Sequence, residues 1–230
     1  MISIIIPTLN EEKYLPILLK SIKNQTYKNY EIIVADNKSK DKTRQIAKKF
    51  GCRIVDGGLP AKARNNGAKI ANGKYLLFLD ADSRIGKFFI ENLIIGVKQK
   101  KLDYTTCFLI PDSKRIEDKI IFFFGNLFAY LLQNIRPLAS GSVLLVKKSI
   151  FEKTGGFDES LKNAEDFDFS IRAYKYGKFG ILTKPKIYIS VRRFDSMGRI
   201  NLLKDILYPT MYFVITKKHS SYEYKFENKK

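Results

Sequence analysis

The stretch LLFLDADS, residues 76–83, joins a strongly apolar run to two acidic residues. Apolar and aromatic residues at 75–79 lead directly into Asp80 and Asp82, which is typical of a buried strand that ends at a polar rim. Two carboxylates this close repel each other unless a cation lies between them. The pattern predicts a divalent cation, Mg²⁺ or Mn²⁺, completed by substrate phosphates. The alternative is a turn whose acids cap a helix beginning near Gly86.

Strands and helices alternate around this stretch through the first hundred residues. The alternation predicts an α/β fold with a mostly parallel central sheet and helices on both faces. Ligands of such sheets bind beyond the carboxyl ends of the strands, so the polar segments after each strand should share one rim. Strands are expected at 2–6, 30–36, 52–56 and 74–80, and helices at 11–25 with Asn10 as cap, 41–50 and 60–71.

The pattern is looser after residue 100. Apolar runs still predict strands, and residues 164–177 have the period of a helix. Residues 199–218 also predict a helix, bent or broken at Pro209. The expected strands of this half are 104–110, 142–146, 180–183 and 186–191.

Composition limits the cellular context. The chain has 230 residues, 45% of them hydrophobic, which suffices for one domain. Cys52 and Cys107 show neither a disulfide framework nor zinc spacing and suit a reducing compartment. The first residues lack the basic leader of a signal peptide. We therefore expect a cytoplasmic protein.

The formal net charge is +19. Such a surface attracts nucleic acid, anionic lipid or a phosphorylated small molecule. An equally good interpretation is a general preference for lysine, so charge alone does not select a function.

The apolar stretch 120–132 is 13 residues long and contains Asn126. A bilayer-spanning helix needs roughly 18 to 20 apolar residues, so no transmembrane helix is expected. Lys119 and Arg136 flank the stretch. One interpretation is an interfacial helix over 120–135, joined by 206–216, at the cytoplasmic face of a membrane. The other is ordinary core packing against the sheet.

Three longer segments, in order, resemble glycosyltransferase family 2, whose members have the nucleotide-sugar-binding GT-A fold. SIIIPTLNEEKYLPILLKSIKNQTYKNYEIIVADNKSKD (3–41) resembles the family's opening, with Pro-Thr-x-Asn-Glu and Val-Asp-Asp-Gly-Ser-x-Asp. AKARNNGAKIANGKYLLFLDADS (61–83) is similar to Ala-Arg-Asn-x-Gly followed by Phe-Leu-Asp-Ala-Asp. SIFEKTGGFDESLKNAEDFDFSIRAYKYG (149–177) resembles the acceptor segment, in which Gly-Gly-Phe-Asp precedes Glu-Asp. The likeness runs from residue 2 to about residue 200.

The resemblance implies a role for each matching residue in binding a nucleotide-diphosphate sugar. Asp36 would contact the base, Arg64 would lie near the nucleotide, and Asp80 would bind the sugar or ribose. Asp82, with Asp80, would hold the metal. Without the resemblance, Arg64 is simply an exposed helix residue. Pro7, Thr8 and Glu11 would line the nucleoside pocket.

For the chemical step, the resemblance makes Asp166, beside Glu165, the catalytic base that accepts the proton of an acceptor hydroxyl. The alternative is that both acids complement a helix dipole behind Asn163 as cap. Arg192 and Arg193 are placed to assist at the phosphates, or else form a solvated strand end.

Two departures from the family pattern matter. Asn37 and Lys38 stand where Asp-Gly is common, which leaves the identity of the base open. The Gln-x-x-Arg-Trp motif of processive members is absent, and SVRRFDSMG (190–198) resembles the Ser-x-Arg-Arg segment of small single-domain members.

The resemblance implies an inverting, metal-dependent glycosyltransferase that acts on an acceptor glycan or a lipid-linked acceptor, with no nucleic acid partner. A nucleotidyltransferase of similar architecture and a non-enzymatic membrane or polyanion binder are the alternatives. We expect one GT-A domain over 1–216, with a nucleotide-binding half (1–100), an acceptor half (101–198) and a C-terminal helical segment (199–216), followed by a mobile basic tail (217–230).

Overall fold

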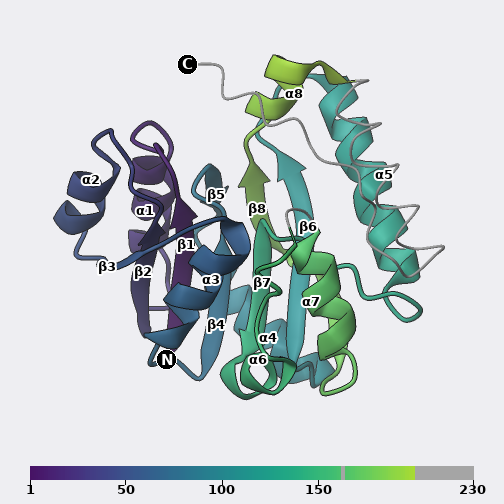
Figure 1. Cartoon of the computed structure of the whole chain (residues 1–230). Coiled ribbons are helices and arrows are strands. Elements are labelled where there is room, and N and C mark those ends of the chain that lie inside the picture. The colour runs from purple at the N-terminus through teal and green to yellow at the C-terminus, as the bar shows by residue number, and fades with distance from the viewer. Residues whose placement is uncertain (162–163, 200–230) are drawn as a thin grey trace.

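The computed structural model describes residues 1–161 and 164–199, and these form a central sheet with helices on both faces (Figure 1). The sheet has the strand order β3-β2-β1-β4-β7-β6-β8-β5. Its strands are β1 (Ile2–Thr8), β2 (Tyr30–Asp36), β3 (Arg53–Asp56), β4 (Tyr75–Leu79), β5 (Ser83–Ile85), β6 (Tyr104–Pro111), β7 (Val143–Lys147) and β8 (Phe179–Ile189). The helices are α1 (Leu15–Lys23), α2 (Thr43–Lys49), α3 (Pro60–Lys69), α4 (Phe89–Lys100), α5 (Ile116–Leu132), α6 (Lys148–Thr154), α7 (Glu165–Ala173) and α8 (Arg192–Met197).

Each face of the sheet has its own hydrophobic core. One core packs side chains of α1, α2 and α4 against the sheet, and the other packs α3, α6 and α7. In β1, Ile4 and Ile6 contribute to the first core and Ile5 to the second, because side chains alternate along a strand. A strand buried on both faces reads as a continuous apolar run, which explains the sequence of β1.

The first four strands in the sheet order form the parallel half. β1 pairs in parallel with β2 and β4, and β2 pairs with β3. The register places Thr8 opposite Asp36, and Asp36 opposite Asp56. The carboxyl ends of these strands therefore share one rim, as the sequence predicted.

The second half is mixed in direction. β7 is antiparallel to both β4 and β6, and β5 is antiparallel to β8. The two strands predicted at 180–183 and 186–191 are one strand, β8, whose pairing with β6 shifts register between Cys107 and Leu109. Pro185 lies within this strand. The shift lets β8 continue past a proline that locally indicates a break.

Other predicted boundaries also need correction or lie outside the described residues. The N-cap of α1 is Tyr14, and Asn10 instead accepts a hydrogen bond from the backbone N–H of Lys40. The predicted cap Asn163, the helix after Arg199 and the tail lie outside the described residues. Within the described ranges, no helix has both the length and the apolar character needed to cross a membrane.

Candidate active site

Acidic side chains from four segments lie along the rim of the parallel half. Glu11 follows β1, Asp36 ends β2, and the β4–β5 connection carries Asp80 and Asp82. Glu165 and Asp166 come from the first turn of α7, far along the chain. Arg64 bonds to Asp80 and Glu165, and Arg192 bonds to Glu11 and Asp82.

Asp36 has no exposed surface and fastens β1 to β2. Its carboxylate accepts hydrogen bonds from the Thr8 hydroxyl at 3.0 Å and the Ser39 backbone N–H at 3.1 Å. Arg44 forms an ion pair with it at 3.2 Å. Asp36 thus fixes the loop after β2, where Lys38 has a φ of 55°. Pro7, next to Thr8, is partly buried in the same corner.

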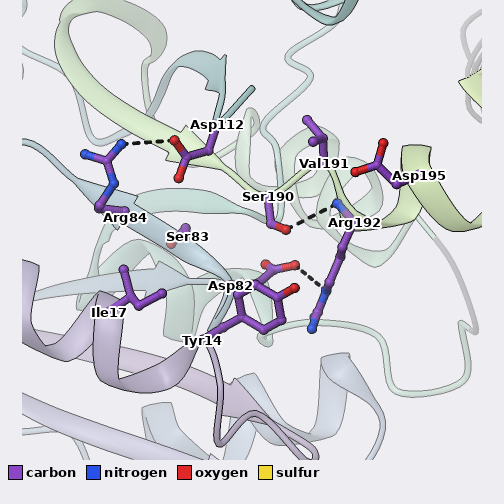
Figure 2. A pocket seen from close by; sticks show the side chains of 10 residues that line it. All are labelled: Tyr14, Ile17, Asp82, Ser83, Arg84, Asp112, Ser190, Val191, Arg192 and Asp195. Carbon is purple, nitrogen blue, oxygen red and sulfur yellow. Dashed lines mark hydrogen bonds and ion pairs between the residues drawn. The ribbon is translucent and has the colours of Figure 1, made fainter. Parts of the chain in front are cut away.

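Arg192, the first residue of α8, joins Glu11 to Asp82 (Figure 2 shows the Asp82 side). Its guanidinium donates to both oxygens of Glu11, at 3.0 and 2.6 Å. Its Nε lies 2.9 Å from Asp82 Oδ2, and its guanidinium carbon lies 4.7 Å from the centre of the Tyr14 ring. This residue is therefore part of an ordered network rather than a freely solvated strand end.

The carboxyl of Asp82 is short of positive charge. Burial raises its pKa above the ordinary value, the charge of Asp80 raises it further, and Arg192 and Arg193 act in the opposite direction. An additional cation would stabilise the ionised form. Hard carboxylate oxygens that lack full neutralisation suit a divalent cation, so the residues present fit the metal predicted from the sequence.

Protein ligands for that metal are few. Within residues 1–161 and 164–199, no three acidic, histidine or cysteine side chains cluster in a way that could hold a metal ion. Asp80 and Asp82 are paired with different arginines, Arg64 and Arg192. Mg²⁺ and Mn²⁺ sites of this type take most of their ligands from water and substrate phosphates.

Arg64 is the second link of the network. The residue is 4% exposed, although an exposed helix position was one interpretation of the sequence. Its guanidinium donates to Glu165 Oε1 at 2.5 Å, to Asp80 Oδ1 at 3.1 Å and to the carbonyl of Gly141 at 3.2 Å. Burial alone would lower the pKa of Arg64, and the carboxylates around it raise the pKa above its usual value. Arg64 thus connects Asp80, which follows β4, with Glu165 in the first turn of α7.

The surroundings of Asp166 raise its pKa towards neutral pH. Burial raises its pKa to about 7, with a further contribution from the charge of Glu165, against the effects of Arg64 and backbone N–H groups. The backbone N–H groups of Gly141 and Phe167 donate to its two oxygens. A base whose pKa lies near the working pH transfers protons efficiently.

A cavity of about 260 Å³ opens beside Asp82 (Figure 2). Arg84 and Asp112 form an ion pair at 3.1 Å on one side, and Arg192 lies on the other. The cavity is lined by Tyr14, Ile17, Asp82, Ser83, Arg84, Asp112, Ser190, Val191, Arg192 and Asp195.

Comparison with known proteins identifies the chain. Residues 3–154 match the model of the family Glycosyl transferase family 2. The chain belongs to this family. The domain is accordingly a glycosyltransferase, which decides among the three classes that the sequence left open.

Family 2 relatives include an uncharacterised glycosyltransferase of Rickettsia prowazekii, 28% identical over 90% of this chain and 70% of the relative. A second is the poly(ribitol-phosphate) β-N-acetylglucosaminyltransferase TarS of Staphylococcus aureus, 28% identical over 83% of this chain and 35% of the relative. The chain thus spans 70% of the length of the first relative and 35% of the length of the second.

Solved structures agree on the GT-A fold. TarS residues 1–349 with UDP-GlcNAc superpose with a TM-score of 0.68 and 25% identity, covering 82% of this chain and 58% of that one. The mannosyltransferase PcManGT of Pyrobaculum calidifontis, in complex with GDP-Man and Mn²⁺, gives a TM-score of 0.69 and 20% identity, covering 83% of this chain and 56% of that one. The predicted family and fold class are confirmed.

Sequence analysis missed three contributors to this family 2 site. Gly141 offers its N–H to Asp166 and its carbonyl to Arg64, and Ser142 donates to Asp80 Oδ2 at 2.9 Å. Tyr14 stacks on Arg192. The loop before β7 has no periodicity and carries no acid, so no local signal marked it. The pairing of Glu11 with Arg192 spans 181 positions and was equally invisible.

Proposed function

We propose that this glycosyltransferase moves a sugar from a nucleotide-diphosphate sugar to an acceptor hydroxyl with inversion at the anomeric carbon. The observation that carries the proposal is the bridge that Arg64 makes between Asp80 and Glu165. Asp82 lies two residues beyond Asp80, and Asp166 directly follows Glu165. In this proposal a diphosphate-binding acid and a base stand at two ends of one site.

On the donor side, Asp82 would hold Mg²⁺ or Mn²⁺, with Asp80 next to it. When bound, the cation supplies Lewis-acid neutralisation of the departing diphosphate. Arg192, which pairs with Glu11 and Asp82, would exchange these bonds for bonds to diphosphate oxygens, which match a guanidinium fork. Arg193 adds positive charge to the same region.

The nucleoside would lie in the corner formed by Pro7, Thr8, Glu11 and Asp36. Asp36 is tied to Thr8 and Ser39, so its role is to hold the loop at 37–39 in the shape that receives the base. Asn37 and Lys38 would then present the groups that distinguish one base from another.

On the acceptor side, Asp166 would remove the hydroxyl proton during attack on the anomeric carbon from the face opposite the diphosphate. Glu165 keeps Arg64 in place and raises the pKa of Asp166. Arg64 counterbalances the acids, so that Asp166 ionises near neutral pH. We place the acceptor, a glycan or a lipid-linked molecule, over α7.

A panel of nucleoside diphosphates in a thermal-shift assay tests the donor side. UDP, GDP or dTDP with Mn²⁺ should raise the unfolding temperature by mass action, and less without the metal. If all three fail with metal present, the proposal is wrong. In a separate test, Asp166→Asn should lower sugar transfer by about 10²–10⁴-fold and leave nucleotide binding unchanged. Loss of both together would assign Asp166 a structural role instead.

A further inference from the structure

Most of the large apolar side chains of α5 face away from the sheet and are exposed. Phe123 is 62% exposed, Phe124 61% and Leu131 67%. Asp118 is the buried residue of the helix. The expectation that stretch 120–132 packs as ordinary core is therefore wrong for most of its large side chains. We call this surface the α5 outer face; it consists of Ile116, Ile120, Phe123, Phe124, Leu127, Phe128, Leu131 and Ile135.

Three polar side chains of α5 and its C-cap bond to the rest of the protein. Asn126 accepts from the backbone N–H of Leu109 and donates to its carbonyl, at 2.9 and 2.8 Å. Gln133 accepts from the N–H of Ile181 at 2.9 Å. Asp118 is fully buried and holds Arg199 through two bonds of 2.7 and 3.0 Å. The helix thus turns polar groups toward the protein and large apolar side chains outward, an arrangement that favours an apolar partner on the outside.

Position and length agree with this orientation. α5 lies at one side of the molecule, beyond β6 and apart from the helices that cover the rest of the sheet (Figure 1). Residues 120–135 contain no charged residue, although 28% of the chain is charged. A 17-residue helix is too short to span a bilayer, so its apolar side has to be covered by a surface lying along it.

We propose that the α5 outer face lies on an anionic membrane surface. Exposed Lys114, Arg115 and Lys119 stand at the start of the helix, and partly buried Arg136 follows its end. Phenylalanine and leucine between basic groups are the composition of helices that lie in the headgroup region of anionic bilayers. Glu117 is the exposed acid among them, so the basic residues outnumber it.

A second copy of the chain fits this face less well. Two antiparallel α5 helices in a twofold contact would set Lys114, Arg115 and Lys119 of one copy against Arg136 of the other. Like charges at both ends of the contact oppose such pairing. A membrane containing anionic lipid satisfies the same charges.

The contact places the candidate active site next to the membrane. Phe122 of α5 packs on Phe194 of α8 with ring centres 5.8 Å apart, and α8 begins with Arg192. An acceptor carried on a lipid would then reach the site along the membrane surface. This last step rests on the proposed function, whereas the membrane contact does not.

Vesicle flotation without nucleotide tests the inference. The full chain should float with vesicles of phosphatidylcholine and phosphatidylglycerol in equal amounts, and less with phosphatidylcholine alone. Phe123→Glu should lower the partition coefficient at least about tenfold. The matched control is Phe88→Glu, an equivalent change at a 53% exposed phenylalanine outside α5, which should retain binding. Both variants should unfold at nearly the wild-type temperature, since both sites are exposed.

Four results would overturn the membrane proposal. The wild type fails to float, or Phe88→Glu loses as much binding as Phe123→Glu. If the wild type does not bind vesicles and Phe123→Glu unfolds several degrees lower than the wild type, the α5 outer face is covered within the chain, with residues 200–216 as the candidate segment. A wild-type dimer that Phe123→Glu converts to a monomer would assign the face to a second copy. None of these results depends on the nucleotide panel, so the two proposals fail separately.

Discussion

Replacement of Arg64 by methionine tests whether the acids of the site depend on one buried cation. The side chain is 5% exposed and forms ion pairs with Asp80 and Glu165 at 3.1 and 2.5 Å. At an effective dielectric constant near 20, each contact of this length is worth about 5–7 kcal/mol before desolvation. Removing one partner of such a buried set costs about 3–5 kcal/mol, because the remaining charges are left unneutralised. Methionine keeps an unbranched apolar stem and removes the charge.

Arg53→Met is the matched control. Arg53 also forms a short ion pair, 2.6 Å to Glu31, but its side chain is 45% exposed. Exposed pairs contribute about 0–1 kcal/mol because water already stabilises both charges. Urea unfolding at neutral pH should therefore separate the two variants by at least about 2 kcal/mol.

The difference should also depend on pH. Arg64 lowers the pKa of Asp166, so without Arg64 the folded-state pKa of Asp166 rises further and the folded variant binds a proton that the unfolded chain does not. As the pH falls towards about 7, where Asp166 of the control also becomes protonated, the variant regains stability and the gap to Arg53→Met narrows. Equal losses in the two variants, or a gap that acidification leaves unchanged, would refute the assigned role of Arg64.

Three further predictions concern the chemistry. Because the pKa of Asp166 is raised to about 7 and the base acts when ionised, the rate of transfer should rise as the pH increases through about 7, and a flat rate profile would contradict the role. The same raised pKa should make the wild type lose stability relative to Asp166→Asn as the pH increases from about 4 to about 7. Arg192→Gln should strengthen binding of Mn²⁺ alone and weaken binding of nucleoside diphosphate, measured by calorimetry beside Arg53→Gln; parallel changes in both affinities would contradict the exchange of partners. Gly141→Ala would place its Cβ 3.0 Å from Asp166 Oδ2 and 3.1 Å from Arg64 Nη2, so transfer should drop about tenfold or more, and an unchanged rate would show that this loop is not tightly fitted.

The sequence predicted the parallel half well because its signals are local. Strands such as β1 and β4 are apolar on both faces, and the helices between them carry a stripe that repeats with the helical period. The acids at strand ends follow directly from that arrangement, since parallel strands end at one rim. Asp36, Asp80 and Asp82 therefore needed no tertiary information to be placed there.

The rest of the site could not be predicted in this way. Gly141 acts through its backbone, so its residue type says nothing about its hydrogen bonds. β8 continues beyond Pro185 because its residues 187–189 pair with both β6 and β5, and these pairings cannot be predicted from local propensity. For α5, apolar residues surround most of the helix, so its period does not predict which side faces the sheet. The orientation of α5 is set by Asn126, which bonds to the backbone N–H and carbonyl of Leu109 beside the register shift in β6.

The placement of the two arginines explains how an acidic cluster persists in a chain that attracts anions. With a formal charge of +19, the chain as a whole favours a diphosphate, but the carboxylates at the rim repel it locally. Arg64 is locked among its partners, whereas Arg192 retains 34% exposure and stands at the start of a short helix. In the proposed mechanism, a donor that brings a cation would replace the charge that Arg192 gives to Asp82, and the freed guanidinium would meet the diphosphate. The cation of the donor would thus supply the positive charge that Asp82 loses when Arg192 turns to the diphosphate.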